Sequence, residues 1–150
     1  MKKIPVFFIN GMLDSGKTTF IIDTLTNDNK ERKAKTLLLV CEEGEVEYSE
    51  ELLKETNTYK HVFESIEEFD YKFIDKLIKN EKPDRVVIEM NGMWELSKLQ
   101  FPRVLEIVQV LLLLMEAHST FILIICVKNL MISLKRVILF VLLKLKHQNL

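Results

Sequence analysis

The sequence predicts an α/β fold with a mainly parallel β-sheet covered by helices on both faces. Over residues 1–102, short apolar runs alternate with segments of helical periodicity. The runs are continuous rather than alternating in polarity, which is typical of parallel strands that are buried on both faces. In addition, Gly11 and Gly16 directly follow the first run, where a tight turn would connect a strand to a helix.

The elements are expected in a simple alternating order along the chain. A helix is predicted from residue 17 to about residue 26, and a second helix is predicted over residues 66–80. The predicted strands cover residues 4–10, 36–41, 61–63 and 85–90. The apolar residues that share one face of the second helix are Ile66, Phe69, Phe73, Ile74, Leu77 and Ile78.

Length, charge and cysteine content restrict the class of protein. A chain of 150 residues has the usual size of one domain. Its formal net charge of −1 gives no general electrostatic reason to bind nucleic acid or an anionic membrane. Cys41 and Cys126 form neither a disulfide framework nor a zinc-binding spacing. The N-terminal segment MKKIPVFFIN has no small-residue cleavage site, so we expect a cytoplasmic protein.

The segment NGMLDSGKTTF contains the spacing Gly11-x-x-x-x-Gly16-Lys17-Thr18 of a phosphate-binding P-loop. Backbone N–H groups of such a loop surround the phosphates, and the following helix N-terminus adds partial positive charge. We expect Lys17 to reach the terminal phosphates and the Thr18 hydroxyl to hold Mg²⁺. The alternative is a strand-to-helix turn without a ligand. The predicted nucleotide-binding residues are Gly11, Met12, Leu13, Asp14, Ser15, Gly16, Lys17, Thr18 and Thr19.

With this motif, the predicted fold is a P-loop NTPase three-layer sandwich, which needs a carboxylate near the metal or the attacking water. Glu89 ends the apolar run in RVVIEMNG, and Asn91 and Gly92 follow it. Ligands of open α/β sheets bind at the carboxyl ends of the strands, so Glu89 and Lys17 should face one crevice. The alternative is an ordinary solvated glutamate at a strand end.

A second group of carboxylates lies in VCEEGEVEYSEELL, residues 40–53. Glu42, Glu43 and Glu45 surround Gly44 directly after a predicted strand. This segment is either a mobile switch that contacts Mg²⁺ or a solvated acidic loop, and composition alone does not separate the two.

Three segments, in this order, resemble the P-loop, switch and Walker B segments of the CobW/HypB/UreG group of GTPases, particularly its CobW-like branch. They are FINGMLDSGKTTF, LLVCEEGEVE and VVIEMNGMWE, all within residues 4–96. The resemblance implies GTP and Mg²⁺ as cofactors, and a GTPase that couples nucleotide state to metal delivery or to maturation of a metalloenzyme or cofactor-enzyme client. It also implies that Lys17 and Glu89 are catalytic and that Thr18, Glu42 and Glu89 approach Mg²⁺.

The chain departs from the resembled family at several positions. Asp14 stands where the family loop usually has glycine, which places a carboxylate beside bound phosphates. The cysteine cluster of the CobW-like branch is missing, and Cys41 stands where the family often has asparagine; we expect it to be a core thiol. His61, His118 and His147 show no metal-ligand spacing. A metal-carrying role therefore rests on the resemblance.

Residues 103–150 form an apolar tail after the predicted nucleotide-binding core, residues 1–102. The tail has no glycine, and 25 of its 48 residues are Leu, Ile or Val. Its segment VQVLLLLMEAHSTF resembles the family's next strand and acidic turn, with Glu116 in place of aspartate. No guanine-reading Asn-Lys-x-Asp follows VILFVLL, residues 137–143. We therefore expect the tail to continue the same domain but to leave it incomplete, and we hypothesise a truncated or frame-shifted gene.

A membrane-inserted tail is the alternative to a folded one. The apolar runs of the tail are each under ten residues and are separated by charged side chains, whereas a membrane span needs about 20 largely uncharged residues. Buried strands or helices are therefore expected at residues 107–115, 119–127 and 137–143.

Three function classes remain open from the sequence. The favoured class is a CobW-like GTPase in which Lys17 and Thr18 position phosphates and Mg²⁺ while Glu89 positions water. The second class is a nucleotide-binding module without useful hydrolysis, because Asp14 and the missing base-recognition segment would weaken binding. The third class is a nonfunctional truncated product.

Overall fold

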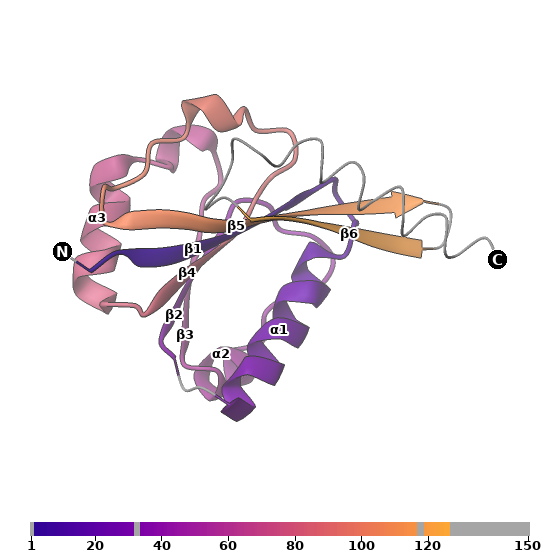
Figure 1. The fold of residues 1–150 in the computed structure, drawn as a ribbon, viewed down its shortest axis with the longest axis horizontal. Helices are drawn as coiled ribbons and strands as arrows, with labels where there is room; N and C mark the ends of the chain where they lie inside the picture. The colour runs from indigo at the N-terminus through magenta and orange to yellow at the C-terminus, as the bar shows by residue number, and fades with distance from the viewer. Residues whose placement is uncertain (1, 32–33, 117–118, 127–150) are drawn as a thin grey trace.

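The computed structural model describes residues 2–31, 34–116 and 119–126, and their strands form one six-stranded sheet (Figure 1). The strands are β1 (Ile4–Gly11), β2 (Thr36–Val40), β3 (Thr58–Val62), β4 (Arg85–Glu89), β5 (Leu105–Glu116) and β6 (Ser119–Cys126). The helices are α1 (Lys17–Glu31), α2 (Glu50–Glu55) and α3 (Tyr71–Glu81), and short 3₁₀ turns cover Ile66–Glu68 and Leu96–Lys98.

The strand order is β3-β2-β4-β1-β5-β6. The pairs from β3 to β5 are parallel, and β6 runs antiparallel to β5. The predicted α/β fold with a mainly parallel sheet is therefore confirmed.

Side chains of the central strands alternate between two core layers, one on each face of the sheet. Leu37 and Leu39 of β2 pack in the cluster that contains Ile74, Leu77 and Ile78 of α3. On the opposite face, the cluster that includes Leu38 and Val40 of β2 contains Ile21 and Leu25 of α1. Figure 1 shows α1 and α3 on opposite sides of the sheet. Helix, sheet and helix thus form the predicted three layers, because continuous apolar strands need a cover on both faces.

The register brings the carboxyl ends of three strands to one level at the centre of the sheet. Glu89 of β4 pairs with Ile9 of β1 on one side and with Val40 of β2 on the other. The ladder continues beyond the strands, since the N–H of Cys41 donates to the Glu89 carbonyl and the N–H of Met90 donates to the Ile9 carbonyl, both at 2.8 Å. The loops after β1, β2 and β4 therefore leave the sheet side by side.

The second predicted helix begins later than expected. Asp70 caps α3 through its side chain, which accepts hydrogen bonds from the N–H groups of Lys72 and Phe73. The cap residue has extended backbone, so the helix cannot continue back to Ile66, which lies in a separate 3₁₀ turn. Most of the predicted face is buried, but Phe73 is 38% exposed.

The other two helices also differ from the sequence prediction. α1 extends to Glu31, five residues beyond the predicted end, because no breaking residue follows Thr26. The six-residue helix α2 was not predicted at all. Ser49 caps it by accepting a hydrogen bond from the N–H of Leu52 at 3.2 Å. A helix this short has too few residues to show a periodic apolar pattern.

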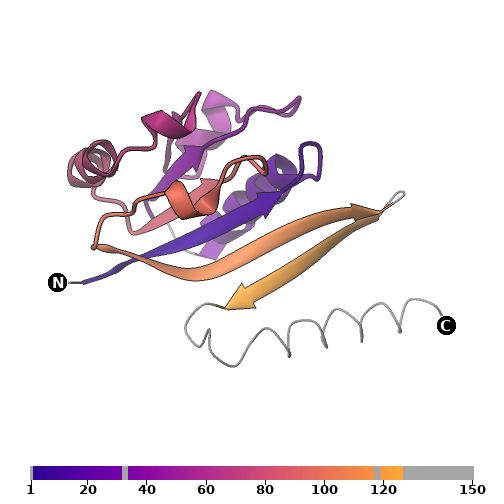
Figure 2. The ribbon, with the colours of Figure 1, turned by 90° about the horizontal axis from the view of Figure 1, so that it is seen from above.

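The beginning of the apolar tail joins the same sheet as the core. β5 lies beside β1, and β6 lies beside β5 (Figure 2). The expected strand thus corresponds to β5, which ends at Glu116, and the turn expected after it falls outside the described residues. The predictions for residues 137–143 and for the terminal segment KLKHQNL fall outside the described residues.

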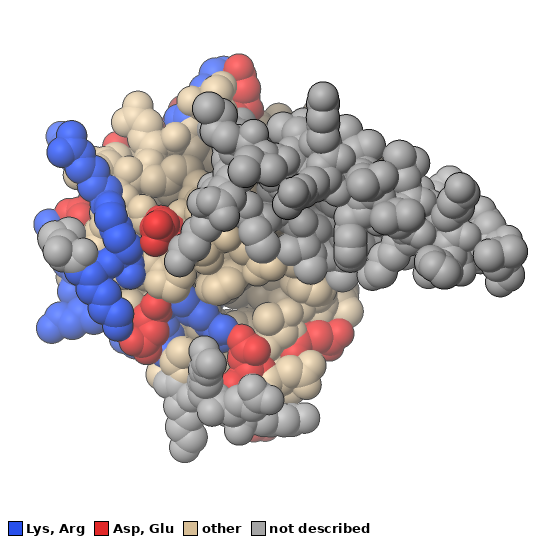
Figure 3. Space-filling model, in the orientation of Figure 1, with Lys and Arg blue, Asp and Glu red and all other residues tan. Residues whose placement is uncertain are grey.

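Both signs of charge are present on the surface. On the face shown in Figure 3, Lys and Arg side chains gather near the N-terminus, and Asp and Glu side chains lie close beside them. Lys35 pairs with Glu81 at 3.0 Å, and Lys79 pairs with Asp75 at 2.6 Å. Within the described parts of the chain, no helix has both the length and the apolar character that crossing a membrane requires.

The two core layers predict that Leu38→Ala lowers the free energy of unfolding by about 2–5 kcal/mol, because the fully buried side chain leaves a cavity between α1 and the sheet. Leu114→Ala is the matched control, since Leu114 is 42% exposed. Urea denaturation would measure both variants. Equal losses of stability in the two variants would contradict the assignment of Leu38 to the core.

Candidate functional site

The nine predicted nucleotide-binding residues cover the last residue of β1, the loop of residues 12–16 and the first turn of α1, and together they form the P-loop. It begins with a hydrogen bond from the Gly11 N–H to the Asn10 side chain at 2.9 Å, and it turns through a Ser15 N–H to Met12 carbonyl bond of 3.2 Å. Asp14 has a φ of +61° and Gly16 a φ of +86°. Aspartate tolerates this left-handed region better than most residues, so Asp14 is compatible with the conformation of the loop at this position.

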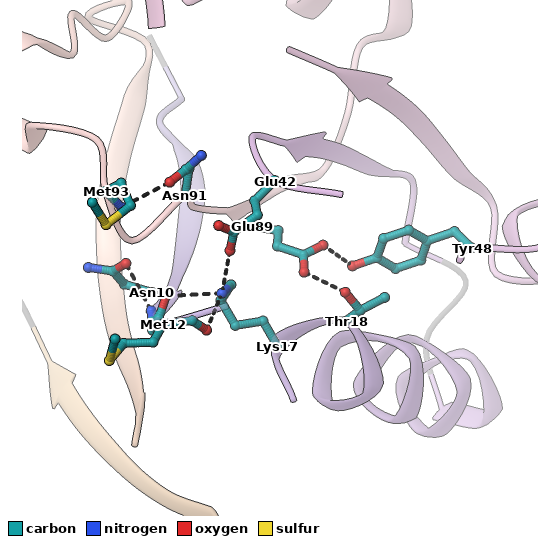
Figure 4. Close-up of polar contacts among 10 residues, drawn as sticks. Asn10, Met12, Lys17, Thr18, Glu42, Tyr48, Glu89, Asn91 and Met93 are labelled. Atoms are coloured by element: carbon teal, nitrogen blue, oxygen red, sulfur yellow. Dashed lines mark hydrogen bonds and ion pairs between the residues drawn. The ribbon is translucent and has the colours of Figure 1, made fainter. Parts of the chain in front are cut away.

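Lys17, at the start of α1, has its ammonium group enclosed by three oxygen atoms (Figure 4). Its Nζ donates to the carbonyl of Gly11 at 2.9 Å, to the carbonyl of Met12 at 2.7 Å and to Oε2 of Glu42 at 2.7 Å. The Lys17 side chain is 4% exposed and the Glu42 side chain 13%. An ammonium group has three donors, so each of them has a partner.

Glu89, at the end of β4, is held by two hydroxyl groups. The Thr18 hydroxyl donates to Oε1 and the Tyr48 hydroxyl donates to Oε2, both at 2.6 Å (Figure 4). Glu89 is 2% exposed, so it is not the solvated strand-end glutamate that the sequence left open. A buried carboxylate needs hydrogen-bond donors, and here each of the two oxygens accepts one hydrogen bond from a hydroxyl group.

Burial is the largest influence on the pKa values of Glu89 and Tyr48. It raises the pKa of the Glu89 carboxyl, and the hydrogen bonds from Thr18 and Tyr48 together with the Lys17 charge oppose the shift. Burial and the nearby Glu89 carboxylate also raise the pKa of the Tyr48 phenol, so Tyr48 remains a hydrogen-bond donor at physiological pH.

Two close backbone approaches fix the P-loop against the ends of the strands. A Cβ added at Gly92 would lie 2.5 Å from the carbonyl oxygen of Gly11, and a Cβ added at Gly11 would lie 2.6 Å from the carbonyl oxygen of Leu113. Since real Cβ atoms do not approach oxygen this closely, only glycine fits at either position. The loop after β4 and the strand β5 therefore support the P-loop from two sides.

A cavity of about 260 Å³ opens between the P-loop and the segment after β2. Its lining brings together Lys17, Thr18, Glu42 and Glu89, which are the predicted catalytic and metal-binding residues. Met12 and Leu13 are 76% and 57% exposed. Leu13 lines the cavity, whereas Met12 contributes the backbone carbonyl that accepts a hydrogen bond from Lys17. The remaining lining residues are Asp14, Gly16, Thr19, Gly44, Glu45 and Val46.

The side chains of this cavity suit a phosphate group with Mg²⁺. Ser15 Oγ is buried without a hydrogen-bond partner among the described residues, but Ser15 is not one of the residues that line this cavity. The Thr18 hydroxyl and the carboxylates of Glu42 and Glu89 are the hard oxygen ligands that Mg²⁺ prefers, and Mg²⁺ usually takes only one or two carboxylates beside phosphate oxygens.

Other candidate metal ligands remain apart from the cavity. Cys41 is 2% exposed, and burial, with a smaller effect of Glu89, raises the pKa of its thiol to about 12. It is the core thiol that the sequence predicts. His61 lies on β3 and contacts the rings of Phe63 and Phe73. Across the described ranges, no three His, Cys, Asp or Glu side chains are grouped so that they could hold a metal ion by themselves.

Sequence reasoning missed Tyr48. It lies 41 residues before Glu89 in the chain, and its segment carries no motif that predicts this contact. The only local signal is its position directly before Ser49, the residue that caps α2.

The fold and the site define a P-loop nucleotide-binding protein. The family described as CobW/HypB/UreG, nucleotide-binding domain, matches residues 5–134, and the chain therefore belongs to this family. Neither the search of curated proteins nor the search of solved structures found a match. The family resemblance of the three sequence segments is thus confirmed.

The contact between Gly92 and Gly11 predicts that Gly92→Ala disturbs the P-loop. The added methyl group would push the Gly11 carbonyl, one of the Lys17 acceptors, out of place. We expect nucleotide affinity to fall about tenfold or more, measured by calorimetry. Met93→Ala is the matched control, because Met93 is the next residue and is 88% exposed. Parental affinity in the Gly92 variant would show that the loop does not depend on this contact.

Proposed function

We propose that this protein is a Mg²⁺-dependent GTPase of the CobW-like branch, and that it works in the cytoplasm. It would couple its nucleotide state to metal delivery or to maturation of a metalloenzyme or cofactor-enzyme client. The observation that carries the nucleotide part of this proposal is the enclosed Lys17 ammonium group, which faces a cavity shared with Thr18 and Glu89. The client part rests on family membership.

The proposed binding mode assigns the phosphates to the P-loop. Backbone N–H groups of the P-loop and the N-terminus of α1 would donate to phosphate oxygens. Lys17 would contact the terminal phosphates, where an ammonium group acts as a strong charge-assisted donor.

Thr18, Glu42 and Glu89 would hold Mg²⁺ together with the phosphates. The ion would offset the negative charge that develops during phosphoryl transfer. The Thr18 hydroxyl is already oriented by Glu89 at 2.6 Å, which leaves its oxygen lone pairs for the metal. Glu89 would also orient the attacking water, since its buried carboxylate lies beside the proposed metal ligand Thr18 and can accept a hydrogen bond.

Nucleotide binding would require Lys17 to exchange one partner. All three of its donors are occupied, two by loop carbonyls and one by Glu42. The carbonyls belong to the loop that surrounds the phosphates, whereas Glu42 is a side chain on a separate segment. A phosphate oxygen would therefore replace Glu42, which would become free to approach Mg²⁺.

Nucleotide binding without useful hydrolysis is the second candidate function. Asp14 is exposed and lines the cavity, and its carboxylate would repel the phosphates. Turnover of GTP by the purified chain would separate this candidate from the GTPase.

The P-loop assignment predicts that Lys17→Ala abolishes Mg-GTP binding, because the loop then lacks its charged donor to the terminal phosphates. Calorimetry with Mg-GTP would measure the affinity, and a melting curve would check that the variant is folded. Lys76→Ala, an exposed lysine on α3, should bind as the parent does. Equal affinity in the parent and the Lys17 variant would refute the proposed function.

Exchange of the Lys17 partner predicts that Glu42→Gln strengthens binding of GTP in the absence of metal. Without its carboxylate, residue 42 no longer competes with phosphate for Lys17, and affinity should rise about tenfold. Titration of a fluorescent GTP analogue in EDTA would measure this change.

Glu43→Gln is the matched control, since it removes the same charge from the next residue, which is exposed and has no contact with Lys17. If both substitutions strengthened binding equally, general charge rather than the ion pair with Lys17 would explain the effect.

A further inference from the structure

The contact between Tyr48 and Glu89 has no role in the phosphate and metal contacts described above. The Tyr48 hydroxyl donates to Oε2 of Glu89 at 2.6 Å, whereas the Thr18 hydroxyl donates to the other oxygen, Oε1. Figure 4 shows each oxygen of the Glu89 carboxylate facing one of the two hydroxyl groups. We propose that Tyr48 is a positioning residue that fixes the orientation of Glu89 for Mg²⁺ and the attacking water.

The surroundings of Tyr48 make it a rigid support. The residue is 8% exposed and packs in the core cluster that contains Leu38, Val40 and Leu53. Directly after it, Ser49 caps α2, so the backbone is also held. Because the core packing already restrains the Tyr48 side chain, its hydroxyl group bonds Glu89 with little further loss of conformational freedom.

Two donors restrain a carboxylate more than one does. With Thr18 alone, the Glu89 side chain could rotate about its terminal bond while keeping one hydrogen bond, because this torsion has broad minima. Donation by Tyr48 to the second oxygen fixes the plane of the carboxylate. Fixed orientation of a buried charge is what electrostatic preorganisation of a reaction requires.

Tyr48 also connects the site to the segment after β2. Glu42 and Tyr48 lie at the two ends of this segment, and they contact Lys17 and Glu89, respectively. When a phosphate replaces Glu42 at Lys17, the Tyr48 contact would still hold the other end of the segment. Glu89 would therefore keep its orientation while Glu42 moves. This inference rests on the proposed nucleotide and Mg²⁺ binding.

The test is Tyr48→Phe, which keeps the buried ring and removes the hydroxyl group. Mn²⁺ binding to the GTP complex, followed by electron paramagnetic resonance, gives a readout that does not depend on turnover. We expect Mn²⁺ affinity and the single-turnover hydrolysis rate each to fall about tenfold. Affinity for GTP without metal should stay within about twofold of the parent, since the Tyr48 hydroxyl donates to Glu89, which is assigned to the metal and the water rather than to the phosphates.

Tyr59→Phe is the matched control, because Tyr59 lies on the edge strand β3 and is 41% exposed. A second comparison uses Glu89→Gln as background. If Tyr48 acts through Glu89, Tyr48→Phe should cause no additional loss of Mn²⁺ affinity in that background.

Two results would overturn the inference while leaving the proposed function in place. One is a Tyr48→Phe variant with parental Mn²⁺ affinity and parental hydrolysis rate. The other is a full additional loss in the Glu89→Gln background, which would show that Tyr48 acts independently of Glu89. A parent protein that binds no GTP would instead refute the proposed function, and this inference with it.

Discussion

The enclosure of the Lys17 ammonium group is the interaction on which the rest of the site depends. A lysine that is only 4% exposed needs a partner for each donor, and the chain supplies two loop carbonyls and the Glu42 carboxylate. The carbonyls require the P-loop to curve around the ammonium group. The carboxylate requires the segment after β2 to approach the loop. One buried charge thus brings together segments that are distant in the chain.

The sheet provides the rigid base for this arrangement. β4 lies between β1 and β2, and its last residue, Glu89, is buried where the carboxyl ends of the three strands meet. Gly92 allows the loop after β4 to touch the backbone of Gly11. Parallel strands with covers on both faces therefore place a positive group, a hydroxyl and two carboxylates around one cavity, which is the general location of ligands in open α/β sheets.

Local patterns allowed much of the fold and the site to be predicted from the sequence. The P-loop spacing identified Lys17 and Thr18, and the end of an apolar run identified Glu89, because these signals depend on short segments. Contacts between distant segments could not be predicted. Neither the ion pair of Glu42 with Lys17 nor the hydrogen bond of Tyr48 with Glu89 has a sequence signal, since both arise when the β2–α2 segment folds over the P-loop.

The central claim is that nucleotide binding separates Glu42 from Lys17. An experimental structure of the protein with Mg²⁺ and a non-hydrolysable GTP analogue would measure the distance between Lys17 Nζ and the Glu42 carboxylate, which is 2.7 Å in the structure described here. The account predicts that a terminal phosphate oxygen contacts Lys17 and that Glu42 lies beyond ion-pair distance. An intact ion pair between Lys17 and Glu42 in the nucleotide-bound protein would contradict it.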